Sequence, residues 1–140
     1  MSERTLVDYT LDGMKPYWQW PFKHADAYTP GVADLSGWIA PAGNVFVELK
    51  ATDDWPARAK TQVRFDAEFT EEQRWFCLER RGWVFVRVRR EYLLFSHAAA
   101  FKLIDTPEGT QAALKAAAVQ IWVGSVNWKE FAKWLRKSKR

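Results

Sequence analysis

The sequence predicts an α/β domain in which helices flank a mixed central sheet. Short segments in which apolar and polar residues alternate are interspersed with segments at helical spacing, and together they give the order β-β-β-α-β-β-α-β-α. The chain has 140 residues, of which 48% are hydrophobic and 27% charged. This is the composition and length of one ordinary globular domain, for which about 100–200 residues are typical.

The first half is expected to contain a short helix and a β-hairpin. The helix lies near residues 3–12, and a first clear strand lies around residues 34–40. The tetrapeptide PAGN at residues 41–44 is a strong turn signal, because proline presets its own φ and glycine and asparagine tolerate positive φ. The second hairpin strand, residues 45–50, alternates strictly between its two faces.

Helices and strands then continue to the end of the chain. A polar loop is expected over residues 52–69. Thr70 and Gln73 fit a capping box that begins a helix, and Gly82 ends it. The remaining elements are strands at 83–89 and 92–95, a helix at 110–118, a strand at 119–123, and a final helix whose apolar face carries Trp128, Phe131, Trp134 and Leu135.

Several classes of protein lose support from composition and motifs. No apolar run approaches the roughly 18 residues of a membrane span, and the start lacks the basic and apolar segments of a secretory signal. A single cysteine, Cys77, excludes an internal disulfide and a cysteine-based zinc site. We therefore expect a cytoplasmic protein, in a bacterial host if it is encoded by a phage. The motifs of P-loop, dinucleotide-binding, serine-hydrolase and zinc-protease sites are also lacking.

The positive charge is concentrated at the C-terminal end. The net charge is +4, yet the last twelve residues, which include Lys133 and Lys137, carry +5 and leave about −1 for the rest. Such a tail suits a polyanion such as nucleic acid. The alternative is a solvated helix end whose cations complement the helix dipole.

A group of chemically useful residues is expected around the hairpin. Alternation places Phe46, Glu48 and Lys50 on one face, and the turn brings Asp34 beside Glu48. Two neighbouring carboxylates are unfavourable unless a cation lies between them. Mg²⁺ or Mn²⁺ would take oxygen ligands from Asp34, Glu48 and the backbone carbonyl of Leu49. Lys50 would then orient water and neutralise charge in phosphodiester hydrolysis. The alternative is an exposed cross-strand ion pair.

Three segments, in this order, resemble motifs of the PD-(D/E)XK nucleases. They are Gly31-Val32-Ala33-Asp34-Leu35, Val47-Glu48-Leu49-Lys50 and Phe69-Thr70-Glu71-Glu72-Gln73-Arg74, and they are followed by Gly82 and the strand Trp83–Val88. Within that superfamily the chain is most similar to small phage and bacterial VRR-NUC type proteins and to Holliday junction resolvase-like proteins. The resemblance covers about residues 28–96. Residues from about 100 to 140 form an α/β extension without a recognised counterpart.

The resemblance implies a restriction-endonuclease-like fold and a role for each matching residue. Asp34 and Glu48 would be metal ligands, Lys50 the catalytic lysine, and Gln73 a helix residue that reaches into the site. Gln73 lies on the same helix face as the apolar residues three and four positions later, which supports this role, but it would equally complete the capping box. Ala33 stands where the family pattern has proline.

An acidic residue on a first helix also helps to bind metal in many members of the superfamily. Glu3, Asp8 and Asp12 are the candidates, and nothing in the sequence selects among them.

The resemblance further implies a Mg²⁺-dependent endonuclease that acts on DNA, including branched DNA such as Holliday junctions. A homodimer is expected, because two symmetric cuts need two sites. The apolar face of the final helix would either form its interface or pack on the sheet. Phosphates would be contacted by five cations: Arg58, Lys60, Arg64, Lys133 and Lys137. Two alternatives are a catalytically silent nucleic-acid-binding module and a structural or interaction domain with an ordinary ion-pair network.

Overall fold

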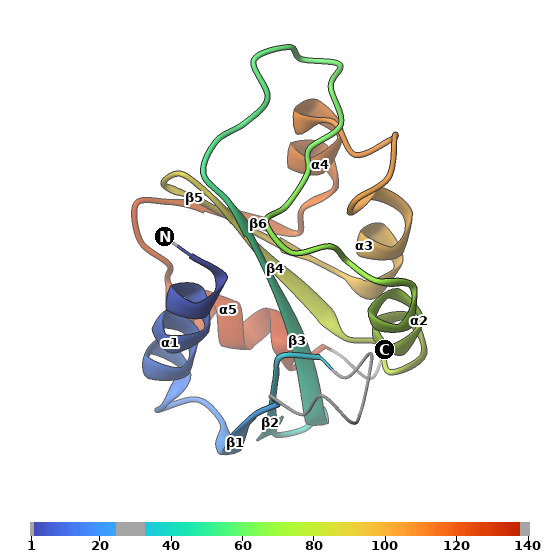
Figure 1. Cartoon of the computed structure of the whole chain (residues 1–140). Helices are drawn as coiled ribbons and strands as arrows, with labels where there is room; N and C mark the ends of the chain where they lie inside the picture. The colour runs from blue at the N-terminus through green and yellow to red at the C-terminus, as the bar shows by residue number, and fades with distance from the viewer. Residues whose placement is uncertain (1, 25–32, 138–140) are drawn as a thin grey trace.

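The predicted α/β class is confirmed. The computed structural model describes residues 2–24 and 33–137, and in these ranges one six-stranded sheet carries helices on both of its faces (Figure 1). Gly31 and Val32, the first two residues of the Asp34 motif, lie outside the described residues. None of the described helices is long and apolar enough to cross a membrane.

The six strands lie side by side in the order in which they occur in the chain. All neighbours are antiparallel except β3 and β4, which are parallel. A parallel pair needs a crossover connection, and helix α2 (Glu71–Glu79) lies within it. The strands are β1 (Gln19–Lys23), β2 (Leu35–Ile39), β3 (Gly43–Thr52), β4 (Trp83–Val88), β5 (Glu91–Phe95) and β6 (Gln120–Val123).

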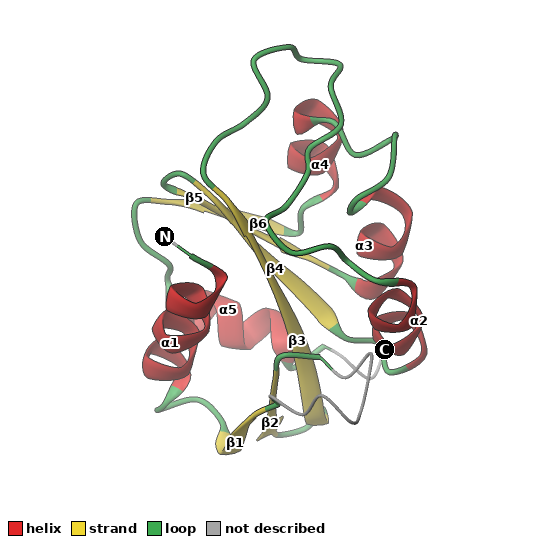
Figure 2. Cartoon of the chain, in the orientation of Figure 1, coloured by secondary structure: helices red, strands yellow, loops and turns green. Residues whose placement is uncertain are grey.

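Helices cover the sheet in two layers. α1 (Glu3–Met14) and α5 (Trp128–Leu135) contribute to the apolar cluster on one face. α2, α3 (His97–Leu103) and α4 (Gln111–Ala117) contribute to the cluster on the other face. In Figure 2 these two groups of helices lie to the left and to the right of the sheet.

Aromatic packing dominates the face under α1 and α5. The ring of Phe85, on central strand β4, has its centroid 4.8–6.2 Å from those of Tyr92, Trp122, Trp128 and Phe131. The apolar face predicted for the final helix therefore packs on the sheet. This confirms the interpretation in which that face packs on the sheet, and the homodimer stays a prediction.

The segment between β3 and α2 is less polar than expected. Val63, Phe65 and Phe69 are buried in the cluster under α2 and α3. The carboxylate of Asp105 accepts hydrogen bonds from the backbone N–H groups of Phe65 and Phe69, at 3.5 and 2.7 Å. The irregular spacing of these apolar residues fits neither the helical nor the strand period, so their burial is not visible in the sequence.

Two elements were not expected at these positions. β1 contains Pro21, is irregular in register and has all five residues exposed, so it lacks an alternating pattern. Proline is tolerated there because β1 lies at the edge of the sheet. α3 buries only Ala100 completely and therefore has no apolar stripe. The remaining elements agree with expectation to within a few residues at their ends.

We expect Phe85→Ala to lower the free energy of unfolding by roughly 3–5 kcal/mol, because it leaves a cavity inside the aromatic cluster. Phe22→Ala is the matched control, since Phe22 is 59% exposed, and it should change stability by no more than about 0.5 kcal/mol. Equilibrium urea unfolding followed by circular dichroism measures both. Similar losses in the two variants would contradict this description of the core.

Candidate functional site

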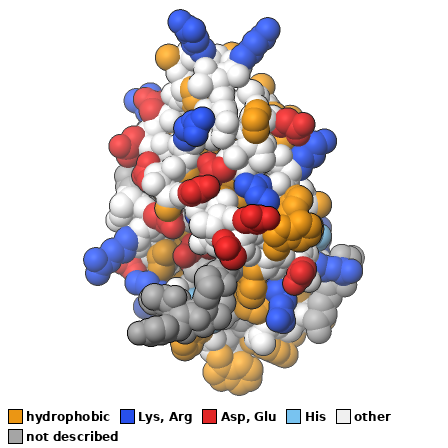
Figure 3. Space-filling model, turned by 45° about the vertical axis from the view of Figure 1, so that its right-hand side comes forward, with side chains coloured by type: hydrophobic (Ala, Val, Ile, Leu, Met, Phe, Trp, Pro, Cys, Tyr) orange, Lys and Arg blue, Asp and Glu red, His pale blue; other side chains and the backbone are white. Residues whose placement is uncertain are grey.

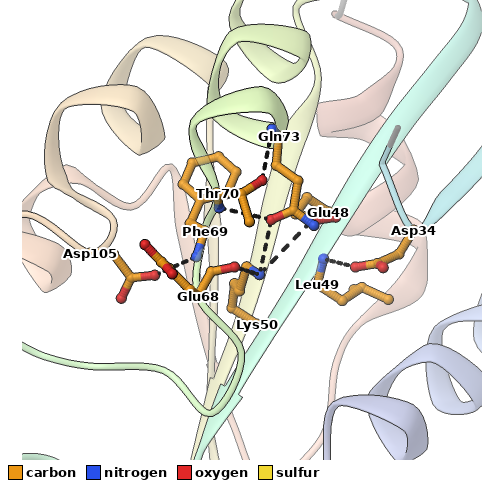
Figure 4. Close-up of polar contacts among 9 residues, drawn as sticks. All are labelled: Asp34, Glu48, Leu49, Lys50, Glu68, Phe69, Thr70, Gln73 and Asp105. Atoms are coloured by element: carbon orange, nitrogen blue, oxygen red, sulfur yellow. Dashed lines mark hydrogen bonds and ion pairs between the residues drawn. The ribbon is translucent and has the colours of Figure 1, made fainter. Parts of the chain in front are cut away.

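The candidate site lies where β2 leaves the edge of β3. Pairing of the two strands ends with Leu35 opposite Val47, and Asp34 lies just beyond this point. β3 continues through Glu48 and Lys50, where its other edge is paired with β4. Polar side chains from β3 and α2 and a backbone carbonyl from the loop before α2 meet beside the part of β3 that is not paired with β2 (Figure 4).

Glu48 and Lys50 are each only 1% exposed. They share a face with Phe46, as predicted, and this face is directed toward α2, because the ring of Phe46 packs against Phe76 at 5.2 Å. The alternative of an exposed cross-strand ion pair is therefore wrong. Two charged groups inside a core require compensating contacts, which makes their partners informative.

Lys50 is held by two oxygen atoms. Its Nζ donates hydrogen bonds to the backbone carbonyl of Glu68, at 2.9 Å, and to Oε1 of Gln73, at 3.4 Å (Figure 4). Oε2 of Glu48 lies 4.0 Å from Nζ, which is too far for a full hydrogen bond. These contacts use two of the three donors of an ammonium group and fix its position beside Glu48.

Gln73 has both of the roles that the sequence left open. Its Oε1 accepts a hydrogen bond from the backbone N–H of Thr70, and Thr70 Oγ1 accepts one from the backbone N–H of Gln73, which confirms the capping box. The same Oε1 accepts from Lys50. The cap therefore orients the amide group that contacts the lysine.

Glu48 is the unusual member of the group. Both of its carboxylate oxygens are buried and have no hydrogen-bond partner among the described residues. Burial raises the pKa of Glu48 well above its usual value, and the nearby charge of Asp34 raises it further, whereas Lys50 opposes the shift. Two neighbouring carboxylates repel each other unless one of them takes up a proton or a cation lies between them.

Asp34 approaches the same edge of β3. Its Oδ2 accepts a hydrogen bond from the backbone N–H of Leu49 at 2.8 Å. The N–H and C=O groups of one strand residue are directed toward the same neighbour. The carbonyl of Leu49, predicted as a ligand, therefore points to the edge where Asp34 lies.

A third carboxylate comes from α1. Glu3 lies in the first turn of this helix, and its Oε2 is buried without a partner among the described residues. The pKa of Glu3 is raised to about 7, chiefly by burial, with contributions from the charges of Asp34 and Asp66, while Lys50 lowers it. Electrostatic coupling to both Asp34 and Lys50 indicates that the start of α1 belongs to the site.

The structure thus selects Glu3 among the three acidic candidates of the first helix. Asp8 and Asp12 instead lie in exposed ion pairs, at 3.9 Å from Lys23 and 3.3 Å from Lys15. Only the packing of α1 against the sheet separates Glu3 from the other two, so no local pattern could have identified it.

The residues present fit a divalent cation in one respect. The two partnerless oxygens of Glu48 beside Asp34 are the kind of ligands that Mg²⁺ prefers, and a cation would also relieve the repulsion between the carboxylates. Asp34, Glu48 and the Leu49 carbonyl would hold it, with Glu3 nearby and water completing the coordination. Within the described ranges, no three Asp, Glu, His or Cys side chains form a preassembled metal site.

Arg58, Lys60 and Arg64 are exposed on the segment between β3 and α2. Figure 3 shows Lys and Arg side chains projecting at the top of the molecule, where Figure 1 shows the bend in the middle of this segment. Arg64 also lines an open depression of about 310 Å³ together with Asp66 and Glu68. This depression is linked to the site through Glu68, whose backbone carbonyl accepts a hydrogen bond from Lys50.

Lys133 and Lys137 are not brought together with the site residues. They lie on and just after α5, which covers the opposite face of the sheet. Lys133 lines a depression of about 130 Å³ with Gln120 and Glu130. Nζ of Lys137 lies 4.2 Å from the centre of the Trp134 ring.

Sequence reasoning did not identify the carbonyl of Glu68 as part of the site. Any residue type can supply a backbone carbonyl, so its identity carries no signal. Its position just before the capping box, in a segment tied down by buried apolar side chains, is what directs it toward Lys50.

We expect Glu48→Gln to stabilise the metal-free protein near pH 8 and to flatten the dependence of its stability on pH. The pKa of Glu48 is raised in the folded protein, so above the ordinary value of 4.5 the folded state binds more protons than the unfolded chain. The free energy of unfolding therefore falls as the pH rises through this interval. Glutamine carries no charge and removes this loss. Urea unfolding in chelator, near pH 5 and near pH 8, measures the difference.

Glu72→Gln is the matched control, because Glu72 is an exposed glutamate of α2. It should alter stability by less than about 0.5 kcal/mol at either pH. If Glu48→Gln proves less stable than the parent protein near pH 8, the attraction of Lys50 outweighs the burial of the carboxylate and this description of the site is wrong.

Comparison of the chain with models of protein families, with curated proteins and with solved structures gives no match. The interpretation of the site therefore depends on its geometry and on the physical chemistry of its residues.

Proposed function

We propose that the protein is a divalent-metal-dependent endonuclease that hydrolyses phosphodiester bonds in DNA, on the restriction-endonuclease-like fold of the PD-(D/E)XK nucleases. One observation carries the proposal. The buried carboxylate of Glu48 has no hydrogen-bond partner among the described residues, yet it lies beside Asp34 and the buried Lys50. Lys50, at 4.0 Å, offsets part of the burial of this charge, but no hydrogen bond does so among the described residues. Buried ionisable groups of this kind are concentrated at functional sites.

The order of the elements supports this fold. Asp34 precedes one strand of the β2–β3 hairpin, and Glu48 and Lys50 lie on the other. Helix α2, with Gln73 in its first turn, leads through Gly82 to β4, which runs parallel to β3. This is the succession of hairpin, helix, glycine turn and valine-rich strand that the resemblance implies.

The chain's own residues would act as follows. A water molecule would attack the phosphorus atom, lose a proton and form a new P–O bond, while one P–O ester bond breaks and the leaving oxygen takes up a proton. The products are a phosphate monoester and an alcohol. Asp34 and Glu48 would hold Mg²⁺ or Mn²⁺, which would supply Lewis-acid activation and neutralise charge on the phosphate. Lys50, held in place by Gln73 and the Glu68 carbonyl, directs its remaining N–H toward the reacting oxygens and stabilises the developing negative charge.

Cations near the site support DNA as the substrate. Arg64 lines a depression together with Glu68, and Arg58 and Lys60 are exposed on the same segment. All three would contact backbone phosphates. We include branched DNA, such as a Holliday junction, among the substrates. Cutting it symmetrically would require a homodimer.

A cleavage assay tests the proposal. The substrates are end-labelled four-way junction, nicked, flap, duplex and single-stranded DNA, with Mg²⁺, with Mn²⁺ and with chelator. We expect cutting only with metal. Glu48→Gln, which weakens the hold on the cation, and Lys50→Met, which removes the ammonium, should each slow cutting roughly 100-fold or more. Both variants should retain DNA binding in chelator.

Glu72→Gln and Lys102→Met are matched controls, because both side chains are exposed on helices, and they should cut at the rate of the parent protein. Undiminished cutting by Glu48→Gln, or cutting in chelator, would contradict the assignment of the site. Binding that weakens with salt but never leads to cutting would favour the silent binding module. If the protein neither binds nor cuts DNA, a structural or interaction domain would be favoured.

We expect Mg²⁺ to stabilise the folded protein near pH 8. A ligand that binds only the folded state at 100 times its dissociation constant adds about 2.7 kcal/mol. Asp34→Asn and Glu48→Gln should lose most of this response, whereas Glu72→Gln should keep it. Thermal unfolding at increasing metal concentration measures the effect. An equal response in Glu48→Gln would show that the cation binds elsewhere.

A further inference from the structure

An exposed row of aromatic side chains lies on β1 and β2. Trp20 is 74% exposed, Phe22 59% and Trp38 36%. The ring centroids of Trp20 and Trp38 are 5.9 Å apart, and those of Phe22 and His24 are 4.7 Å apart. We name Trp20, Phe22, His24 and Trp38 the aromatic shelf. Figure 3 shows hydrophobic side chains gathered at the bottom of the molecule, where Figure 1 shows β1 and β2.

The aromatic shelf lies beside the candidate site, on the same face of the sheet. Trp38 is paired with Asn44, and Ser36 with Phe46. Residues directly opposite one another in antiparallel strands point to the same face, so Trp38 lies on the face that carries Phe46 and Glu48. The backbone N–H of His24 also donates a hydrogen bond to the carbonyl of Asp34 at 2.8 Å. One end of the shelf is therefore tied to a proposed metal ligand.

The charges around the aromatic shelf favour a polyanion. The strand positions that the register places on this face outside the candidate site carry no carboxylate; they are Gln19, Phe22, Ser36, Trp38, Asn44 and Phe46. Cations border the row at two places. The guanidinium of Arg80 lies 5.7 Å from the ring of Phe76, which packs on Phe46. Arg136 follows α5 on the other face of the sheet and meets Trp38 at the end of β2, where both line a depression of about 230 Å³.

We propose that the aromatic shelf stacks unpaired bases of the DNA strand whose phosphate reaches Lys50 and the cation site beside Glu48. The flat face of every base can stack on an exposed ring, while nearby cations contact the backbone. Paired bases already stack on one another inside a duplex, so the shelf selects single-stranded or opened DNA. This inference rests on the proposed function, because it names the form of DNA that reaches that site.

A second copy of the chain is a less suitable occupant. Exposed apolar rows of this kind are often subunit interfaces. A symmetric contact through this surface would bring copies of the same bordering cations toward one another, without carboxylates on the strand positions of the shelf to offset them.

Fluorescence anisotropy of the intact protein tests the proposal. The probe is a labelled single-stranded oligothymidylate, compared with a labelled blunt duplex, and both are measured in chelator so that binding does not depend on cleavage. We expect Trp20→Ala and Phe22→Ala each to weaken binding of the single strand about fivefold or more. Trp20→Phe keeps an aromatic ring and should retain most of the affinity. Duplex binding should be unchanged in all three variants.

Trp75→Ala is the matched control. Trp75 is 48% exposed, but it lies on α2 with its ring against Phe101, outside the shelf. Its loss should leave binding of the single strand within about twofold of the parent protein. Circular dichroism of each variant verifies the fold, and Phe22→Ala provides the test if Trp20→Ala does not fold.

Unchanged binding of the single strand by Trp20→Ala and Phe22→Ala would overturn the proposal, as would an equal loss in Trp75→Ala or an equal loss of duplex binding. A shift from dimer to monomer in Trp20→Ala, with oligothymidylate binding intact, would instead identify the shelf as a subunit interface. The binding test is independent of the cleavage assay. If binding depends on the rings but no DNA is cut, the proposed nuclease function is refuted and the role of the aromatic shelf stands. If DNA is cut but binding does not depend on the rings, the nuclease function stands and the role of the shelf is refuted.

Discussion

The burial of two opposite charges on one central strand is the constraint on which the rest of the structure depends. Glu48 and Lys50 lie on β3 under α2, each 1% exposed. A buried ammonium group requires oxygen partners. For Lys50 these are Gln73 of α2 and the backbone carbonyl of Glu68 in the segment before α2. The capping box of α2 and the apolar anchors of the preceding segment therefore contribute directly to the site as well as to the fold.

Only one of the two buried charges has hydrogen-bond partners. Lys50 has hydrogen-bond acceptors at fixed positions, whereas both oxygens of Glu48 have no partner among the described residues. The carboxylate of Glu48 lies where β3 is no longer paired with β2. Asp34 and Glu3 of α1 add further negative charge at this place. The ammonium group has its hydrogen bonds, whereas the Glu48 carboxylate beside it has none among the described residues. This arrangement suits a bound cation and a phosphate better than structural pairing.

Most of the fold is predictable from local patterns. The hairpin turn, the alternation along β3, the capping box of α2 and the apolar face of α5 each involve residues a few positions apart, whose relation is set by backbone geometry. β1 and α3 lack such patterns, since one is wholly exposed and the other buries a single residue completely. Burial of Val63, Phe65 and Phe69 is invisible for the same reason, because their spacing has no regular period.

For the site, the sequence alone determines that Glu48 and Lys50 share a face and that Gln73 caps the helix facing them, because both relations are local. Only the tertiary structure decides that the pair is buried, that Glu3 rather than Asp8 or Asp12 joins it, and that Lys133 and Lys137 lie on the opposite face. These outcomes depend on how α1, α5 and the segment before α2 pack on the sheet. Such packing brings together residues far apart in the chain, and no pattern within a few positions encodes it.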